Sequence, residues 1–263
     1  PLSRWPNEGF THVDKALGET QFAVRGLPGH REGVFSCVDD RVERWVNEKD
    51  ALVRGYWFRD WVVQTQRIES IDPENRIIRL AKPYHNYGGY RDGMWFFGLN
   101  LLCEIDSPGE WMIDREKGLL YFWPPGSLES GRAEVSVADG LFRLTNTAHV
   151  TLRGFRLEAA RGTAVRIHQS DACRLLGCTI RNVTNYGVTI LDGKNCAVVG
   201  CDITETGGGG VFMAGGDREK LIPAGHVVEN CHIHHFARWD RTYRPGVLMT
   251  GVGLRASHNL IHH

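Results

Sequence analysis

Three segments in the second half of the chain repeat one pattern: Val150-Thr151-Leu152-Arg153-Gly154-Phe155-Arg156-Leu157, Cys173-Arg174-Leu175-Leu176-Gly177-Cys178-Thr179-Ile180 and Cys196-Ala197-Val198-Val199-Gly200-Cys201-Asp202-Ile203. Their spacing is 23 residues, from Phe155 to Cys178 and again to Cys201. Two further copies follow at spacings of 30 residues (Cys201 to Cys231) and 28 residues (Cys231 to Asn259). A second short strand keeps step with the first: Val165-Arg166-Ile167, Val188-Thr189-Ile190, Val211-Phe212-Met213 and Val247-Leu248-Met249.

Internal repeats of this length indicate a solenoid, because one coil cannot bury its apolar face alone and has to stack on its neighbours. The short strands alternate in polarity and glycines fall at the corners, which is typical of a parallel β-helix. A leucine-rich repeat has a similar period, but its leucine pattern and its helical return segment are absent from this sequence. The sequence therefore predicts about five stacked coils of an all-β parallel β-helix.

Alternation along each strand assigns every second side chain to the inside of the solenoid. The predicted inner ladders are Phe155, Cys178, Cys201, Cys231 and Asn259, and next to them Leu157, Ile180, Ile203, Ile233 and Ile261. The chain has seven cysteines, an odd number, with no C-x-x-C motif and no zinc-site spacing. We interpret most of these cysteines as small buried residues of the core rather than as ligands.

The first part of the chain, residues 1–132, predicts an N-terminal antiparallel β module with a leading segment, and residues 133–263 predict the coils. Strand patterns separated by turn signals occupy 51–57, 68–71 and 76–80, and a hairpin is expected over 110–123. Residues 39–49 are expected to form one short helix. Because the pattern stops at His263 in the middle of a coil, we expect that the natural protein continues with further coils.

Charge and hydropathy argue against two classes of partner. The 31 Lys and Arg residues balance the 31 Asp and Glu residues, so a nucleic-acid backbone meets no long-range attraction. No stretch approaches the ~20 apolar residues that a membrane-spanning helix requires. The glycine run at 207–210 falls at a coil corner with no helix after it, so it does not predict a phosphate-binding loop. We expect no nucleic-acid partner, no membrane partner and no cofactor.

Further motifs accompany the repeat: Arg4-Trp5-Pro6-Asn7, Gly55-Tyr56-Trp57 with Asp60-Trp61, Pro108-Gly109-Glu110-Trp111, Leu120-Tyr121-Phe122-Trp123-Pro124-Pro125 and Gly215-Gly216-Asp217-Arg218. Together these features resemble the bacterial right-handed parallel β-helix repeat proteins associated with polysaccharide breakdown, over essentially the whole chain. The resemblance implies a right-handed coil and a polysaccharide or oligosaccharide substrate. It also implies export, so a secreted or periplasmic location is expected.

The outward side chains of the first repeat strand form two columns of polar residues. One column is Arg156, Thr179, Asp202, His232 and Leu260, and the other is Glu158, Arg181, Thr204, His234 and His262. Neighbouring rungs of a sheet lie only ~4.8 Å apart, so acids, arginines and histidines gather on one face. This density of charge suits a cleft for a charged or hydroxylated ligand.

Two insertions, at 216–222 and 237–245, are expected to flank the same rungs. Loops carried on a rigid solenoid are the expected place for function, and the second insertion combines rings that stack on sugars with arginines that bind hydroxyls or carboxylates. The candidate substrate-binding residues are Arg181, Arg218, Lys220, Trp239, Arg241, Tyr243 and His262.

Glycoside hydrolysis normally uses two carboxyl groups, ~5 to 5.5 Å apart for retention and ~6.5 to 9.5 Å apart for inversion. The candidate catalytic residues are Asp202, Asp217, Asp240, His232 and His234, with Glu158 and Glu205 in reserve. The preferred function is a glycoside hydrolase that acts on a plant or algal polysaccharide.

Three other functions stay open on the sequence alone. A polysaccharide lyase needs a base for the C5 proton and a cation to neutralise the uronate carboxylate, roles that His232 and the arginines can fill. A zinc site formed by His232, His234 and His262 is a further alternative, although no bound metal is the preferred expectation. The third is a non-catalytic carbohydrate-binding surface, which would lack two carboxyl groups within ~10 Å of each other.

Overall fold

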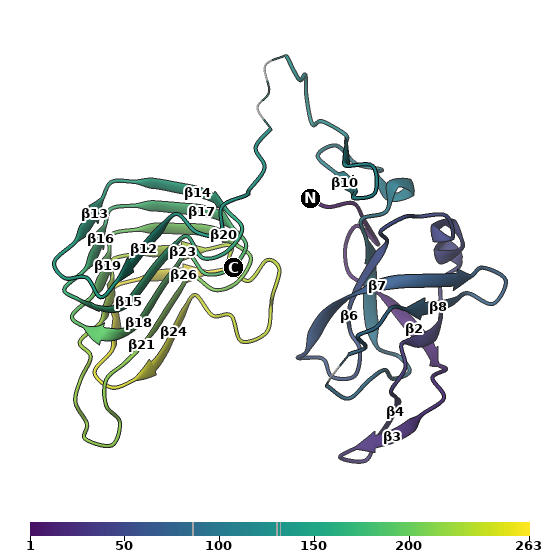
Figure 1. Ribbon diagram of the computed structural model, residues 1–263, viewed down its shortest axis with the longest axis horizontal. Coiled ribbons are helices and arrows are strands. Elements are labelled where there is room, and N and C mark those ends of the chain that lie inside the picture. The colour runs from purple at the N-terminus through teal and green to yellow at the C-terminus, as the bar shows by residue number, and fades with distance from the viewer. Residues whose placement is uncertain (86, 130, 132) are drawn as a thin grey trace. The chain divides into compact units, whose positions relative to one another are not determined.

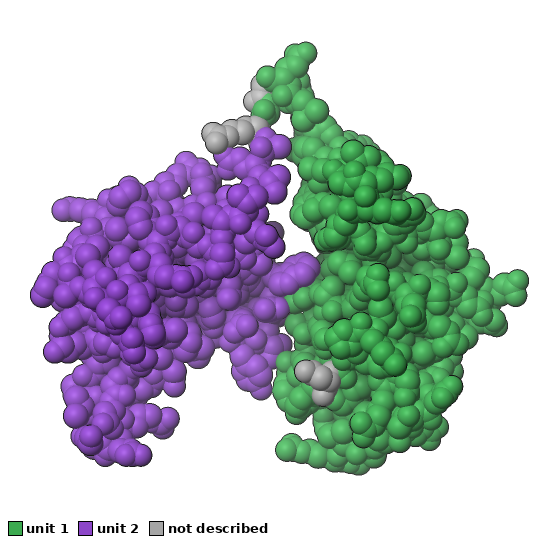
Figure 2. Space-filling view, viewed as in Figure 1, with its two compact units in different colours: residues 1–132 green, residues 133–263 purple. Residues whose placement is uncertain are grey.

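The computed structural model describes residues 1–85, 87–129, 131 and 133–263. It divides into two compact units, residues 1–132 and residues 133–263 (Figures 1 and 2). Both units are built from β strands, with two short 3-10 helices in the first. Over these described ranges, no helix combines the length and the apolar character needed to cross a membrane.

The first unit contains a closed antiparallel β barrel. Its strand order is β1-β9-β2-β5-β8-β7-β6, and β6 at one end of the order also pairs with β9, which closes the sheet. Irregular pairing between Val13 and Lys15 and between Ile68 and Ser70 bends two of the strands, as barrel closure requires. The barrel strands are β1 (Arg4–Trp5), β2 (Thr11–Ala16), β5 (Val34–Cys37), β6 (Leu52–Tyr56), β7 (Val63–Asp72), β8 (Ile77–Leu80) and β9 (Trp95–Leu99).

Aromatic rings fill the barrel interior. Phe35, Trp57, Tyr90 and Phe96 are all fully buried, and their ring centroids lie between 5.2 and 6.4 Å apart in the contacts they make. Rings of this size supply the apolar burial that a small barrel needs for stability.

Two hairpins and two 3-10 helices complete the first unit: β3 (Gln21–Val24) with β4 (Leu27–His30), β10 (Trp111–Asp114) with β11 (Leu119–Phe122), η1 (Asp40–Trp45) and η2 (Leu102–Glu104). The β10–β11 pairing confirms the hairpin expected over 110–123. The helix expected over 39–49 is shorter than predicted and is of the 3-10 type. Three residues per turn place Val42 and Trp45 on one side, and both are buried there.

The second unit is a parallel β-helix in which each coil supplies one strand to each of three five-stranded sheets (Figure 1). One sheet contains β12 (Phe142–Thr145), β15 (Val165–Asp171), β18 (Val188–Lys194), β21 (Val211–Gly215) and β24 (Val247–Gly251). The next contains β13 (Thr151–Arg153), β16 (Arg174–Leu176), β19 (Ala197–Val199), β22 (Val227–Glu229) and β25 (Arg255–Ser257). The third contains β14 (Arg156–Ala160), β17 (Thr179–Val183), β20 (Asp202–Thr206), β23 (His232–His234) and β26 (Leu260–His262).

The predicted register of the third sheet is confirmed. Leu157, Ile180, Ile203, Ile233 and Ile261 pair in order along the stack, and the two polar columns pair as expected. The corner between the second and third sheets is tight and needs a residue with positive φ, which Gly177, Gly200 and Asn230 supply at 57°, 62° and 53°. The longer fourth and fifth repeats keep the register, because their extra residues lie in loops outside the strands.

The cysteines of the inner ladder behave as core residues. Cys178, Cys201 and Cys231 are buried and carry free thiols. The two ends of that ladder differ from the expectation. Phe155 is 44% exposed and packs on Phe142 at the first rung. Asn259 is half-buried, and its Oδ1 accepts a hydrogen bond from the backbone N–H of Cys231.

Candidate functional site

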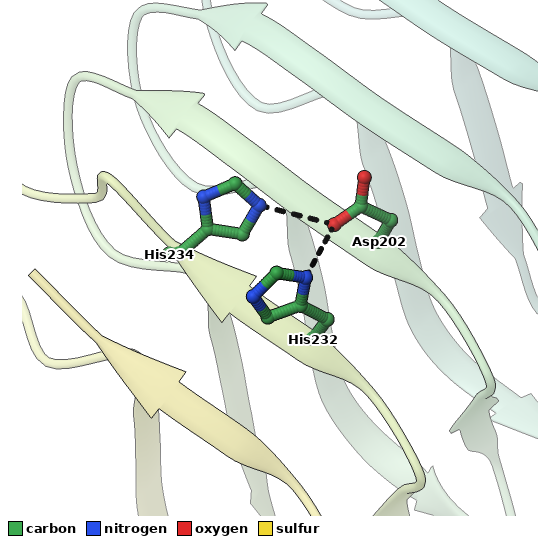
Figure 3. Close-up of side chains that lie close together, drawn as sticks. All are labelled: Asp202, His232 and His234. Carbon is green, nitrogen blue, oxygen red and sulfur yellow. Dashed lines mark hydrogen bonds and ion pairs between the residues drawn. The ribbon is translucent and has the colours of Figure 1, made fainter.

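Three side chains of the predicted polar columns meet on the outer face of the third sheet. Asp202 begins β20 and His232 begins β23, and the two residues are paired in register. His234 is paired with Thr204 two residues further along the same strands. Figure 3 shows both imidazole rings directed at the Asp202 carboxylate. The structure thus brings together three of the five predicted catalytic residues.

One carboxylate oxygen receives both imidazole contacts. The Oδ1 atom of Asp202 lies 3.4 Å from Nδ1 of His232 and 3.2 Å from Nε2 of His234. The two rings stack on each other with centroids 4.0 Å apart and planes inclined by 24°. A carboxylate with imidazoles on one side can hold a proton, pass it on, or share a cation with them.

The core of the solenoid fixes these outward directions. Ile203 and Ile233 are fully buried, and each lies between two outward residues of its strand. Because successive side chains of a strand point to opposite faces, burying the isoleucines turns the flanking polar side chains outward. The site is open to solvent: the exposed fraction of the side chain is 44% for Asp202, 42% for His232 and 18% for His234.

Three more histidines extend the cluster towards the end of the chain. Nε2 of His262 lies 2.8 Å from Nε2 of His232, and Nδ1 of His235 lies 2.7 Å from Nδ1 of His234. His263 stacks on His235 with ring centroids 4.6 Å apart. Burial and the neighbouring imidazoles lower the pKa of His262. The sequence analysis named His262 but missed His235 and His263, although both lie next to a predicted site histidine in the sequence.

The other side of Asp202 carries an arginine and glutamate pair. Nε of Arg181 donates to Oε2 of Glu158 at 2.6 Å, and Arg156 adds a second ion pair to Glu158 at 3.2 Å. Arg181 lies in register with Thr204, one rung from the strand of Asp202 and two rungs from the histidines. The predicted sugar-binding Arg181 therefore already has a carboxylate partner on the same face.

The insertion that carries Asp240 folds against the preceding coil. The backbone N–H groups of Trp239 and Asp240 both donate to the carbonyl of Gly207, just beyond the far end of β20. Asp202 begins that strand, and four residue steps at ~3.3 Å each place ~13 Å between the two ends of the strand. Asp240 forms an ion pair with Arg244 at 3.7 Å. Asp240 is thus attached beyond the opposite end of β20 and does not lie beside Asp202.

The aromatic and basic residues of that insertion are accessible to solvent. Trp239 is 41% exposed and Tyr243 is 75% exposed, and Arg241 is also exposed. The structure shows that these three residues are exposed, and their contact with a sugar stays a prediction.

Asp217 lies at a different corner of the coil. It follows β21 and precedes β22, whereas the insertion with Asp240 connects the third sheet to the first. Its carboxylate accepts the backbone N–H groups of Glu219 and Lys220 and pairs with the Lys220 side chain at 3.5 Å. Asp217 therefore caps its own turn, and the structure does not bring it, Arg218 or Lys220 to the Asp202 cluster.

Comparisons with known proteins agree with the architecture. The sequence model of a family described as "Right handed beta helix region" matches residues 142–263, which hold strands β12 to β26. A solved structure named "Glycoside hydrolase" superposes with a TM-score of 0.75 at 13% identity, over 99% of this chain and 56% of that chain. The second unit is therefore a right-handed parallel β-helix, and the fold of the chain is that of this structure.

A second solved structure, the Gp54 tailspike of Acinetobacter baumannii bacteriophage AP22 in complex with A. baumannii capsular saccharide, gives a TM-score of 0.20 at 7% identity, over 96% of this chain and 58% of that chain. This likeness is too low to bear on the fold. The search of curated proteins found no match to this chain. The chain spans little more than half the length of either solved structure.

Proposed function

We propose that the protein is a secreted or periplasmic carbohydrate-active enzyme, a glycoside hydrolase that acts on a plant or algal polysaccharide. The observation that carries the proposal is the position of the Asp202 carboxylate, exposed on the sheet face with two imidazoles directed at one of its oxygens. The fold shared with a structure named as a glycoside hydrolase supports the class of substrate.

In this proposal Asp202 exchanges a proton with the glycosidic oxygen or with the attacking water. His232 and His234 hold or move the proton at the Oδ1 atom, because both have a ring nitrogen within 3.4 Å of it. The open side of the cluster admits the sugar. Trp239 and Tyr243 supply exposed ring faces for stacking, and Arg241 supplies donors for hydroxyl or carboxylate groups.

Glu158 is the second carboxyl group of the proposal. It lies two rungs from Asp202 on the same face, so their backbones are at least ~9.6 Å apart. The carboxyl groups of an inverting enzyme lie ~6.5 to 9.5 Å apart, with a water between the sugar and the base, so the proposal requires both side chains to extend towards each other across the rung between them. Two arginines form ion pairs with the Glu158 carboxylate, Arg156 at 3.2 Å and Arg181 at 2.6 Å.

The test is a screen against neutral and uronic-acid polysaccharides, in which reducing ends and the ultraviolet absorbance of unsaturated products are read together. Hydrolysis yields reducing ends without the unsaturated chromophore. Asp202→Asn should remove this activity, whereas Asp192→Asn should retain it. Asp192 is a matched control because it faces His168 at 3.8 Å on another sheet of the same solenoid. Full activity of Asp202→Asn would exclude Asp202 from the mechanism.

A polysaccharide lyase is the second candidate function, and one observation favours it. The groups in contact with Asp202 are imidazoles rather than a second carboxyl group, and β-elimination needs one base and one cation. Here His232 would take the C5 proton and Arg181 would neutralise the uronate carboxylate. Unsaturated products in the same screen would establish this reaction. Glycan binding without either product would favour a carbohydrate-binding surface.

A further inference from the structure

We propose that Asp202, His232 and His234 bind a divalent transition-metal ion, and that zinc is the ion that fits best. Each residue offers one ligand atom, and these three atoms all lie within 4.8 Å of one another. Two imidazole nitrogens and one carboxylate oxygen form a donor set that zinc accepts, whereas calcium and magnesium prefer oxygen alone. The proposal goes beyond the proposed function, because the ion binds whether or not a glycan is cleaved.

The spacing of the ligand atoms fits a shared ion. Ligands that surround a tetrahedral zinc ion at ~2.0 to 2.2 Å lie ~3.3 to 3.6 Å from one another. The Asp202 oxygen lies 3.4 Å from Nδ1 of His232 and 3.2 Å from Nε2 of His234. Both values are longer than the ~2.7 to 2.9 Å of a hydrogen bond between charged groups. Two nitrogens aimed at one oxygen at this range give two edges of a coordination tetrahedron, and the ligand atoms of all three residues lie within 4.8 Å of one another.

The remaining ring nitrogens of both ligands have partners of their own. Nδ1 of His234 lies 2.7 Å from Nδ1 of His235 and 3.2 Å from the hydroxyl of Thr204. Nε2 of His232 lies 2.8 Å from Nε2 of His262. Metal-binding histidines usually have their second nitrogen held in this way, which fixes the tautomer and the orientation of the ring. His262 therefore supports the site from outside, and Asp202 takes the third ligand position that the sequence analysis gave to His262.

The strands hold the three ligands in place before an ion arrives. Asp202 and His232 are neighbours in the parallel ladder of β20 and β23, and buried isoleucines anchor both strands. A prearranged site loses little entropy on binding. The exposed sides of Asp202 and His232 leave room for a fourth ligand from solvent, either a water molecule or an oxygen of a bound sugar. Three protein ligands and one open position are typical of zinc sites that act on a substrate.

The experiment is a calorimetric titration of the chelator-treated full chain with zinc chloride alone, at neutral pH and without a glycan. We expect one ion per chain with a Kd at or below about 1 μM, a value that corresponds to the affinity of a well-formed site. Cobalt(II) added in place of zinc should give the visible absorption of a tetrahedral ion. His234→Ala and Asp202→Asn should each weaken zinc binding at least about 100-fold, and Thr204→Val about 10-fold.

Two controls separate this site from other histidines. His168→Ala removes an imidazole that also faces an aspartate on the same solenoid, and it should leave the titration unchanged. A double His235→Ala and His263→Ala variant should still bind one ion, because neither residue is in the proposed ligand set. Thermal unfolding checks that each variant is folded. If His234→Ala or Asp202→Asn does not fold, His234→Gln is used in its place.

The absence of saturable binding to the native chain would overturn the proposal, and so would zinc affinity that is unchanged in both His234→Ala and Asp202→Asn. Failure of the metal site is distinguishable from failure of the proposed function. The titration contains no glycan, and the activity screen on chelator-treated chain contains no zinc.

Discussion

Glu104 is completely buried in the first unit, and its carboxylate accepts a hydrogen bond from the indole Nε1 of Trp45 at 2.9 Å. The same carboxylate accepts two further donors from Arg41, at 3.1 and 2.8 Å. This arrangement ties η2 to η1 beside the barrel. A buried carboxylate is tolerated there because its charge is neutralised and its oxygens are hydrogen-bonded.

We therefore expect Glu104→Ala to lower the free energy of unfolding of the first unit by about 3 kcal/mol, because the indole and the guanidinium lose their partner. Denaturant unfolding followed by tryptophan fluorescence measures this, since seven of the eight tryptophans lie in residues 1–132. The control is Glu116→Ala, which breaks the exposed pair with Lys49 and should leave the free energy of unfolding nearly unchanged. Equal effects of the two substitutions would contradict the role of Glu104.

The stability of the first unit should fall in mild acid because of His85. Burial lowers the pKa of His85 from 6.5 to about 4. Its Nδ1 atom lies 2.6 Å from Oε1 of Gln64, and Nε2 is buried without a hydrogen-bond partner among the described residues. Between about pH 6.5 and about pH 4 the unfolded chain binds a proton that the folded chain does not, so the loss grows as the pH falls and is complete below about pH 4.

The expected loss is about 3 kcal/mol over that range. Urea unfolding at a series of pH values measures it. His85→Gln should flatten the profile in this window, whereas His12→Gln, at an exposed position, should follow the native profile. A profile that keeps its slope in His85→Gln would assign the pH dependence to other groups.

The thiols should be almost inert in the folded chain. Of the seven free cysteines, six are buried and Cys103 is half-buried. Burial raises the pKa of Cys103 to about 12 and that of Cys196 to about 11, which removes these two thiolates at neutral pH. The hydrogen bond with Cys201 lowers the pKa of Cys231, but this side chain is buried and out of reach of a reagent. A colorimetric thiol assay should register seven thiols after denaturation and no fast reaction before it. Rapid labelling of the folded chain at Cys178, Cys201 or Cys231 would show that the inner ladder opens.

Trp239 should contribute to glycan binding rather than to the chemical step. Its side chain is 41% exposed, and it lies on the insertion whose backbone N–H groups donate hydrogen bonds to the carbonyl of Gly207. Removing a stacking ring weakens substrate and transition state alike, so Trp239→Ala should raise KM about tenfold and leave kcat nearly unchanged. Trp123→Ala is the matched control, because Trp123 is similarly exposed at 45% but lies in the first unit. An unchanged KM in Trp239→Ala would remove this ring from the binding surface.

The fold of the second unit could be predicted from the sequence because its information is local and repeated. The 23-residue spacing and the inward run of isoleucines determine which residues pair, and the pairing of Asp202 with His232 follows from them. Phe155 departs from the prediction because the alternation rule assumes a covered coil on both sides, and this ring lies at the first rung.

The barrel could be predicted only in part, because its closure depends on contacts that are distant in the sequence. The pattern indicated the hairpin of β10 and β11, but the pairing of β6 with β9 joins residues 39 to 47 positions apart and leaves no local signal. The candidate site could likewise be predicted only in part. Register placed Asp202, His232 and His234 together, whereas the positions of Asp217 and Asp240 depend on how two loops fold back on the solenoid.

Extra residues at the coil corners leave the pairing of the strands unchanged. The fourth repeat is seven residues longer than the third, yet β20 and β23 pair residue for residue as β17 and β20 do. Residues added at a corner therefore do not change which residues of the neighbouring strands pair. The corner loops can therefore be lengthened, shortened or exchanged by recombination while Asp202, His232 and His234 keep their places, so the proposed binding loops and the proposed site can evolve separately.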